Sequence, residues 1–241
     1  MPTFREVLNI NEQFAIDNLK EDSGVKLLML HFSKMDSANL LISMDKEIPE
    51  DVYQNFLYGV DRYVVKGIPV QHIIGYEEFY GHKFIVNKDV LIPRFETEEL
   101  VANVLMYYDE VFNSDKVNVV DVGTGSGCLA ITLDIEESNM TVTATDISKE
   151  ALTVAKLNNK KLKGNVTFIE GDMLKPLEGM KFDILVSNPP YIPNEEYVET
   201  LVIDNEPSVA LFGGEDGLDF YKEIIKNAES ILNDKYIIAF E

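Results

Sequence analysis

The sequence predicts an α/β protein with a doubly wound, mostly parallel sheet, preceded by a small helical bundle and a β-hairpin. Short apolar runs alternate with helical patterns over residues 117–241, which is typical of strand–helix–strand units in a parallel sheet. Residues 3–66 instead carry apolar side chains at helical spacing. We therefore expect a helical domain over residues 1–75, a hairpin linker over 76–92 and a sheet domain over 93–241.

The first domain is predicted to consist of several short helices. Pro49 precedes two acidic residues, which predicts a helix with proline at its first position and negative charge in its first turn. A helical domain ahead of a catalytic one often recognises a macromolecular substrate, which is the role we expect here. The alternative, that it only covers one face of the sheet, stays open at this point.

The linker is expected to form two strands, because residues 76–92 alternate between apolar and polar side chains, with a turn at Gly81-His82. The pattern from Glu96 to Phe112 predicts a helix that leads into the sheet domain.

A glycine-rich turn follows the first strand of the sheet. The apolar run Val117–Val122 leads into Gly123-Thr124-Gly125-Ser126-Gly127, and a helical pattern begins at Cys128. Glycines between a strand and a helix let a ligand approach the backbone. The dinucleotide fingerprint needs Gly or Ala where this chain has Cys128, so a nicotinamide oxidoreductase is disfavoured.

Acidic residues follow the next two strands. Asp146 ends the run 141–145, where a carboxylate can accept both hydroxyls of a ribose; Ser148 is the better N-cap for the helix that follows. After the run 166–170, Asp172 could accept an exocyclic amine of adenine while Met173 packs on the ring.

The most informative segment is Asn188-Pro189-Pro190-Tyr191, directly after the apolar run 182–187. Two prolines end the strand. The side-chain carbonyl of Asn188 and the backbone carbonyl of Pro189 are then free to accept hydrogen bonds. Two acceptors beside an aromatic ring suit a planar NH₂ group on adenine, on cytosine or on a carboxamide.

These motifs resemble the class I, Rossmann-like methyltransferases that use S-adenosylmethionine. Three further segments, 69–75, 91–98 and 210–218, narrow the resemblance to the bacterial release-factor glutamine methyltransferases, also called the HemK or PrmC family. It covers essentially the whole chain. The family methylates the glutamine side chain in the Gly-Gly-Gln tripeptide of peptide chain release factors, which are the protein partners that the resemblance implies.

The resemblance assigns candidate site residues. Cofactor contacts are implied for Gly123, Thr124, Gly125, Ser126, Gly127, Asp146, Met173 and Asn188, with Phe95 from segment 91–98. Asp172 and Arg94 are cofactor candidates on the chemistry of their own side chains. The substrate amide is expected on Asn188, Pro189, Pro190 and Tyr191, of which Asn188, Pro189 and Tyr191 are the catalytic candidates. The family usually has proline at the place of Phe95. We expect the fifth strand at residues 236–241. Members of the family add a helix and a β-hairpin after this strand, so we expect a truncated chain.

Two further candidates have open alternatives. Asp121, at the end of the first strand, would lie near the ammonium group of the cofactor or cap the glycine loop. Arg94 would pair with the cofactor carboxylate or tie the hairpin to the helix after it. For the reaction itself we expect in-line transfer of a sulfonium methyl group to an amide nitrogen, with S-adenosylhomocysteine as product. Because that nitrogen is a poor nucleophile, catalysis would depend on positioning.

Charge and cysteine content bound the partners. The net charge is −21, with 21 basic against 42 acidic residues, whereas nucleic-acid binding depends on Lys and Arg. We therefore expect a protein substrate, no direct nucleic-acid binding and no membrane. A single cysteine suits the cytoplasm, and the three histidines His31, His72 and His82 show no metal-binding spacing. Two alternatives remain, an adenine-specific DNA or RNA methyltransferase and a catalytically idle factor-binding module.

Overall fold

A computed structural model describes residues 1–241, which divide into two units. The helical unit is Met1–Gly75 together with Thr200–Asn205, and the sheet unit is Tyr76–Glu199 together with Glu206–Glu241. The chain thus leaves the sheet unit after Glu199, contributes a short segment to the helical unit and returns at Glu206. Nothing in the sequence predicted this excursion.

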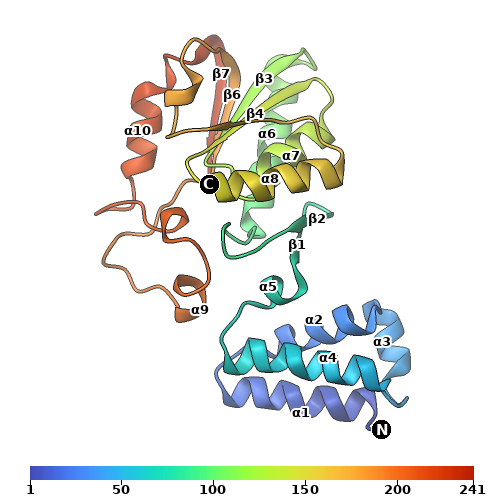
Figure 1. The fold of residues 1–241 in the computed structure, drawn as a ribbon. Helices are drawn as coiled ribbons and strands as arrows, with labels where there is room; N and C mark the ends of the chain where they lie inside the picture. Colours follow the sequence, from blue (N-terminus) through green and yellow to red (C-terminus); the bar gives the residue numbers. More distant parts are fainter. The chain divides into compact units, whose positions relative to one another are not determined.

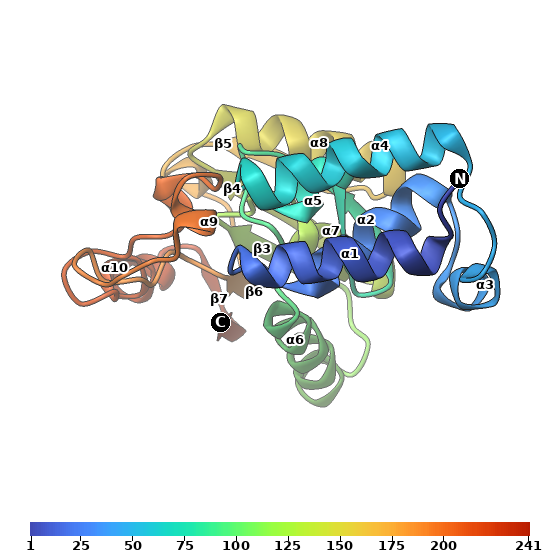
Figure 2. The ribbon, with the colours of Figure 1, turned by 90° about the horizontal axis from the view of Figure 1, so that it is seen from below.

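In the helical unit, α2 packs against both α1 and α4 (Figures 1 and 2). Thr3 and Glu6 form a capping box at the start of α1. Pro49 is the N-cap of α4 rather than the predicted first helical residue, because its ψ of 141° is extended. The helix therefore begins one residue later than predicted, at Glu50. The elements are α1 (Phe4–Asp17), α2 (Asp22–Ser33), α3 (Ser37–Ser43), α4 (Glu50–Val60), a π-helical turn (Asp61–Val65), α5 (Val70–Ile74) and α9 (Thr200–Ile203).

The sheet unit begins with an antiparallel hairpin of β1 (Tyr76–Phe79) and β2 (His82–Ile85). Its turn residues are Tyr80 and Gly81, both with positive φ (49° and 76°), as a tight hairpin of this hand requires. The turn is thus one residue earlier than predicted. The second strand also ends earlier, at Ile85 rather than Ile92, because Val86 and Val90 are buried against α8 instead of continuing the ladder.

The main sheet has five parallel strands in the order β5-β4-β3-β6-β7, which confirms the predicted doubly wound α/β fold. Its strands are β3 (Val117–Val122), β4 (Met140–Asp146), β5 (Thr167–Glu170), β6 (Phe182–Ser187) and β7 (Leu232–Phe240). Its helices are α6 (Glu96–Phe112), α7 (Cys128–Glu136), α8 (Lys149–Leu162) and α10 (Asp219–Ala228), with single 3₁₀ turns at Lys175–Leu177 and Ser208–Ala210.

Helices cover both faces of this sheet: α6, α7 and α8 lie on one side and α10 on the other (Figures 1 and 2). The strands are therefore apolar in both directions. Val119 packs toward α6 and α7, whereas the next residue, Val120, packs toward α10, and both are fully buried.

The chain runs outward in opposite directions from the central neighbours β3 and β6, to β4 and β5 on one side and to β7 on the other. This is the topological switch point, and ligands of such sheets bind beyond the carboxyl ends of the strands there.

Candidate functional site

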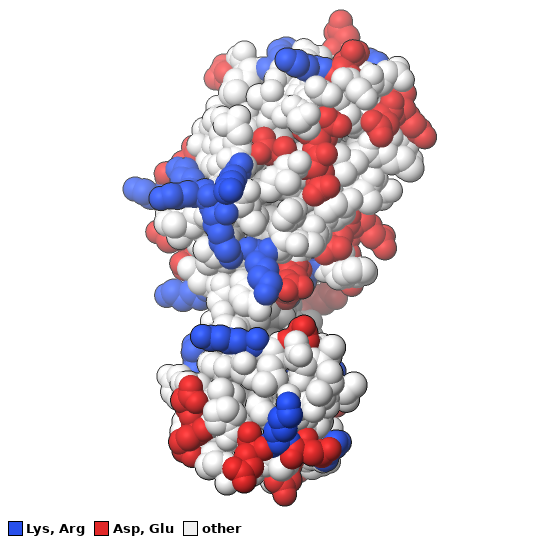
Figure 3. All heavy atoms as spheres, turned by 90° about the vertical axis from the view of Figure 1, so that its right-hand side faces the viewer, with Lys and Arg blue, Asp and Glu red and all other residues white.

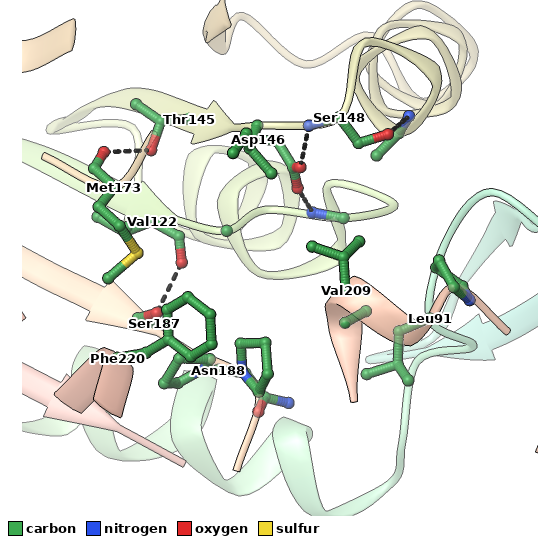
Figure 4. Close-up of a pocket in the computed structure, with 18 of the residues that line it drawn as sticks. Leu91, Val122, Thr145, Asp146, Ser148, Met173, Ser187, Asn188, Val209 and Phe220 are labelled. Atoms are coloured by element: carbon green, nitrogen blue, oxygen red, sulfur yellow. Dashed lines mark hydrogen bonds between the residues drawn. The ribbon is translucent and has the colours of Figure 1, made fainter. Parts of the chain in front are cut away.

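A cavity of about 200 Å³ lies at this switch point. A hydrogen bond joins the ends of β6 and β3 there: the buried hydroxyl of Ser187 donates to the carbonyl of Val122 over 2.6 Å (Figure 4). The cavity lining comes from the ends of β3, β4 and β6, from the loop after β5, from the starts of α8 and α10 and from two further segments, 90–91 and 207–210. The lining residues are Val90, Leu91, Val122, Gly123, Gly125, Thr145, Asp146, Ile147, Ser148, Ala151, Gly171, Asp172, Met173, Ser187, Asn188, Pro189, Pro190, Pro207, Val209, Ala210 and Phe220.

The glycine loop gives the cavity an open backbone wall. Gly123 and Gly125 line it with positive φ (77° and 56°), and a side chain at either position would meet no atom within 4 Å. Their missing side chains therefore leave room for a ligand. Gly127 has the opposite reason to be glycine: a Cβ there would lie 2.8 Å from Ile131 and 3.2 Å from Ala155, so it permits α7 and α8 to pack closely.

Asp146 is held rigidly at the edge of the loop. One carboxylate oxygen accepts the backbone N–H of Gly125 and the other that of Ser148, each over 2.8 Å (Figure 4). Each oxygen keeps a further lone pair for a ligand. Burial raises the pKa of Asp146. Ser148 caps α8 through a bond from the Ala151 N–H, as predicted.

Asp172 and Met173 line the same cavity from the loop after β5. Met173 has a positive φ of 53°, and the Thr145 hydroxyl donates to its carbonyl over 3.4 Å. The Met173 side chain lies at the end of the cavity opposite Leu91 (Figure 4). The Asp172 carboxylate is paired with Lys175.

Asn188 and Pro189 follow β6 into the cavity, with Pro190 beside them. The Nδ2 of Asn188 donates to the Thr97 hydroxyl over 3.3 Å, whereas no hydrogen bond occupies its Oδ1. The Pro189 carbonyl is likewise unbonded. The structure thus presents two neighbouring free acceptors.

A smaller cavity of about 40 Å³ continues from the larger one and shares Leu91, Gly123, Gly125 and Asn188 with it. Thr124, Ser126 and Arg94 line only this smaller cavity. The hydroxyl of Ser126 is buried without a partner. Arg94 is bonded to Glu206 over 2.7 Å.

Asp121 lies beneath the glycine loop rather than in a cavity wall. It is fully buried, one oxygen accepts the Thr124 hydroxyl over 2.6 Å, and the other oxygen has no partner. Burial raises the pKa of Asp121 to about 7. The geometry thus matches the capping alternative. Burial also raises the pKa of the Cys128 thiol to about 12, which fits a packing residue rather than a nucleophile.

Four predicted site residues are absent from the lining of both cavities: Asp121 and Gly127, described above, and Phe95 and Tyr191. Phe95 is 75% exposed, because it is the N-cap position of α6 on the surface of the sheet unit. Tyr191 is 49% exposed. Its backbone turns away because the carbonyls of Pro190 and Tyr191 pack on segment 213–217, where a Cβ on Gly213 or Gly217 would come within 2.4 and 2.2 Å of them.

Sequence reasoning missed the apolar lining. Leu91, Val209 and Phe220 line the cavity (Figure 4), yet each belongs to a loop or helix start with no motif of its own. The only signal was that Leu91 and Ala210 fall within segments that supported the family resemblance.

The cavity fits an adenosyl cofactor. The pair of open glycines, the ribose-type carboxylate of Asp146 and the apolar surface from Met173 and Phe220 are the parts that such a molecule needs. The lining of the larger cavity contains no basic side chain. No group of three or more side chains in the structure could hold a metal ion, and no helix has the length and apolarity needed to cross a membrane.

Comparisons with known proteins agree with this architecture. Residues 105–206 match the model of the methyltransferase small domain, and residues 12–75 match that of the PrmC N-terminal domain. The release factor glutamine methyltransferase of Bacillus cereus is 43% identical over 98% of this chain and 84% of its own length. The enzyme of the same name from Bacillus subtilis is 45% identical over the whole of this chain and 85% of its own length. The chain is thus a methyltransferase and belongs to the release factor glutamine methyltransferase family.

Proposed function

We propose that this protein methylates the side-chain amide nitrogen of the glutamine in the Gly-Gly-Gln motif of peptide chain release factors, with S-adenosylmethionine as the methyl donor. The observation that carries the proposal is the pair of free acceptors, Asn188 Oδ1 and the Pro189 carbonyl, at the wall of a cavity suited to an adenosyl group. The names of the relatives support the same reaction.

The cofactor residues fall into two groups. Gly123, Gly125 and Asp146 would hold the adenosine part, and Met173 and Asp172 would contact its adenine ring. The smaller cavity, with its unpaired Ser126 hydroxyl and Arg94, would receive the amino-acid part. When bound, S-adenosylmethionine supplies an electrophilic methyl group on a sulfonium centre.

The chain's own contribution to the reaction is orientation. A carboxamide NH₂ has two N–H groups, and the two acceptors at Asn188 and Pro189 match them. Holding both N–H groups fixes the plane of the amide and stabilises positive charge that develops on its nitrogen. Thr97 restrains the Asn188 side chain, so its Oδ1 is positioned before the substrate binds.

A protein substrate also fits the charge of the molecule. Acidic side chains are spread over the surface shown in Figure 3, whereas the Lys and Arg side chains on that face gather mainly in one area. With 42 acidic residues against 21 basic ones, the chain is poorly suited to neutralise a phosphate backbone. We therefore propose that it does not bind nucleic acid directly. We also propose that the helical unit recognises the release factor, because residues 12–75 match the PrmC N-terminal domain.

The test is mass spectrometry of a release factor after incubation with the protein and S-adenosylmethionine. We expect one methyl group on the glutamine of the Gly-Gly-Gln motif and none when that glutamine is changed to glutamate, which lacks the NH₂ donors. Methyl transfer to adenine in RNA or DNA, or to the glutamate variant, would contradict the proposal. Cofactor choice is checked separately: S-adenosylhomocysteine should raise the melting temperature, whereas NADH should not.

A further inference from the structure

One wall of the larger cavity is built from two loops that are far apart in the sequence. Val90 and Leu91 come from the loop after the hairpin, and Pro207, Val209 and Ala210 come from the segment that returns from the helical unit. Leu91 and Val209 lie at the same end of the cavity, away from Met173 (Figure 4). No strand or helix fixes these loops to each other.

The side chain of Glu206 joins the two loops. Its Oε2 accepts the backbone N–H of Ile92 over 2.9 Å, and its Oε1 accepts the Nη2 of Arg94 over 2.7 Å. The side chain is only 1% exposed. A buried carboxylate is stable only where hydrogen bonds and an opposite charge compensate it, and here both oxygens are used. The contact therefore restricts Glu206 to one position.

Glu206 lies at the point where the chain returns to the sheet unit. The residue before it, Asn205, belongs to the helical unit and donates to the carbonyl of Gly67 there over 2.8 Å. The residues after it line the cavity. Glu206 is thus the first residue of the returning segment that belongs to the sheet unit, and its side chain fixes the start of the stretch that lines the cavity.

We propose that Glu206 is a positioning residue for methyl transfer: it clamps loop 90–94 to segment 206–210 and so holds the wall of the cavity in the shape that binds cofactor and substrate. This inference rests on the proposed function for its effect on turnover, but not for its effect on cofactor binding. Glu206 touches neither reactant site directly, since it is absent from the lining of both cavities.

The test compares Glu206→Gln with a matched control, Asp183→Asn. Glutamine keeps the shape of the side chain but replaces one acceptor by a donor, so one of the two bonds is lost. Asp183 also accepts one backbone and one side-chain N–H, from Asn118 over 2.8 Å and from the Nδ2 of Asn233 over 2.6 Å, although both partners are neutral. It lies at the start of β6, at the opposite end of the strand from Asn188.

Both variants should lose some thermal stability. At a temperature where circular dichroism shows both to be folded, Glu206→Gln should bind S-adenosylhomocysteine about tenfold more weakly in calorimetry. It should also methylate a Gly-Gly-Gln release factor at least about tenfold more slowly at saturating cofactor, since misplacement by about 1 Å suffices for such losses. Asp183→Asn should match the wild type in both measurements. If Glu206→Gln does not fold, Glu206→Asp, which keeps the charge but has a side chain one methylene too short to reach both partners, should show the same pattern to a smaller degree.

Wild-type cofactor affinity and turnover in both Glu206→Gln and Glu206→Asp would overturn the inference. Equal losses in Glu206→Gln and Asp183→Asn would do so as well, because the effect would then be one of general stability. If the wild type fails to methylate the release factor, the proposed function is wrong, while the cofactor affinities still decide the role of Glu206.

Discussion

Replacing Asp121 by asparagine should remove a pH-dependent loss of stability. The carboxyl group is fully buried, and its pKa is raised from 3.8 to about 7. Because the folded protein holds this proton more tightly than the unfolded chain, stability falls as the pH rises from about 4 to about 7. Between pH 5.5 and pH 8 the raised pKa corresponds to a loss of about 2 kcal/mol, as an order of magnitude. Asp121→Asn cannot ionise, so it should not show this part of the loss.

Urea denaturation of the wild type and of Asp121→Asn at pH 5.5 and pH 8 measures the effect. The free energy of unfolding should drop more between the two pH values in the wild type than in the variant. Thr124→Val provides a second check. The Thr124 hydroxyl bonds to the Asp121 carboxylate and lowers the pKa of Asp121. Its removal should raise that pKa further and enlarge the drop in the free energy of unfolding between pH 5.5 and pH 8. Equal drops in the wild type and Asp121→Asn would refute the reasoning and would indicate that Asp121 is solvated or paired in solution.

Other substitutions probe the cofactor loop and the acceptor pair. Asp146→Asn loses a charge-assisted acceptor and should weaken S-adenosylhomocysteine binding roughly 10- to 150-fold, from about 1.5–3 kcal/mol per such bond; an unchanged dissociation constant in calorimetry would sink the ribose assignment. Asn188→Ala should lower turnover roughly 10²- to 10³-fold and cofactor affinity much less, which methylation kinetics and calorimetry would separate. Gly127→Ala, with φ at 82° and a Cβ within 2.8 Å of Ile131, should lower the free energy of unfolding by about 1–3 kcal/mol. Unchanged urea denaturation would contradict that packing.

The central elements were predictable because their signals are local. The strands at 117–122 and 182–187 and the helix from Glu96 to Phe112 have the predicted bounds, since apolar periodicity and flanking Gly or Pro define them within a short window. The order of these elements then predicts a parallel sheet, and with it a cavity at the carboxyl ends of the strands. Residues at the carboxyl ends of the strands or directly after them, such as Gly123, Asp146 and Asn188, line that cavity for this reason.

The outer wall of the site was not predictable, because it depends on contacts between distant segments. Glu206 is one of several glutamates in its part of the chain, and no local pattern separates it from Glu195, Glu196 or Glu199. In the structure it alone of these is buried, at 5% exposure, while the other three are exposed. Its partners Ile92 and Arg94 are more than a hundred residues away, and a single sequence gives no information on that pairing.

The placement of Tyr191 distinguishes a role in cofactor binding from a role in substrate binding. Asn188 and Pro189 line the cofactor cavity, whereas Tyr191, two residues further on, is half exposed and lies outside it. A side chain that packed on the cofactor would be expected in the cavity wall, as Met173 is. A half-exposed ring that lies outside the cavity wall, two residues after Pro189, is instead accessible to a group that arrives from solvent, as the glutamine of a protein loop must. On this argument Tyr191→Phe should have a mild effect, because the ring face would make the contact. Tyr191→Ala should instead impair methylation while leaving the dissociation constant of S-adenosylhomocysteine nearly unchanged. A loss of cofactor affinity in Tyr191→Ala would indicate that the ring contacts the cofactor rather than the substrate amide.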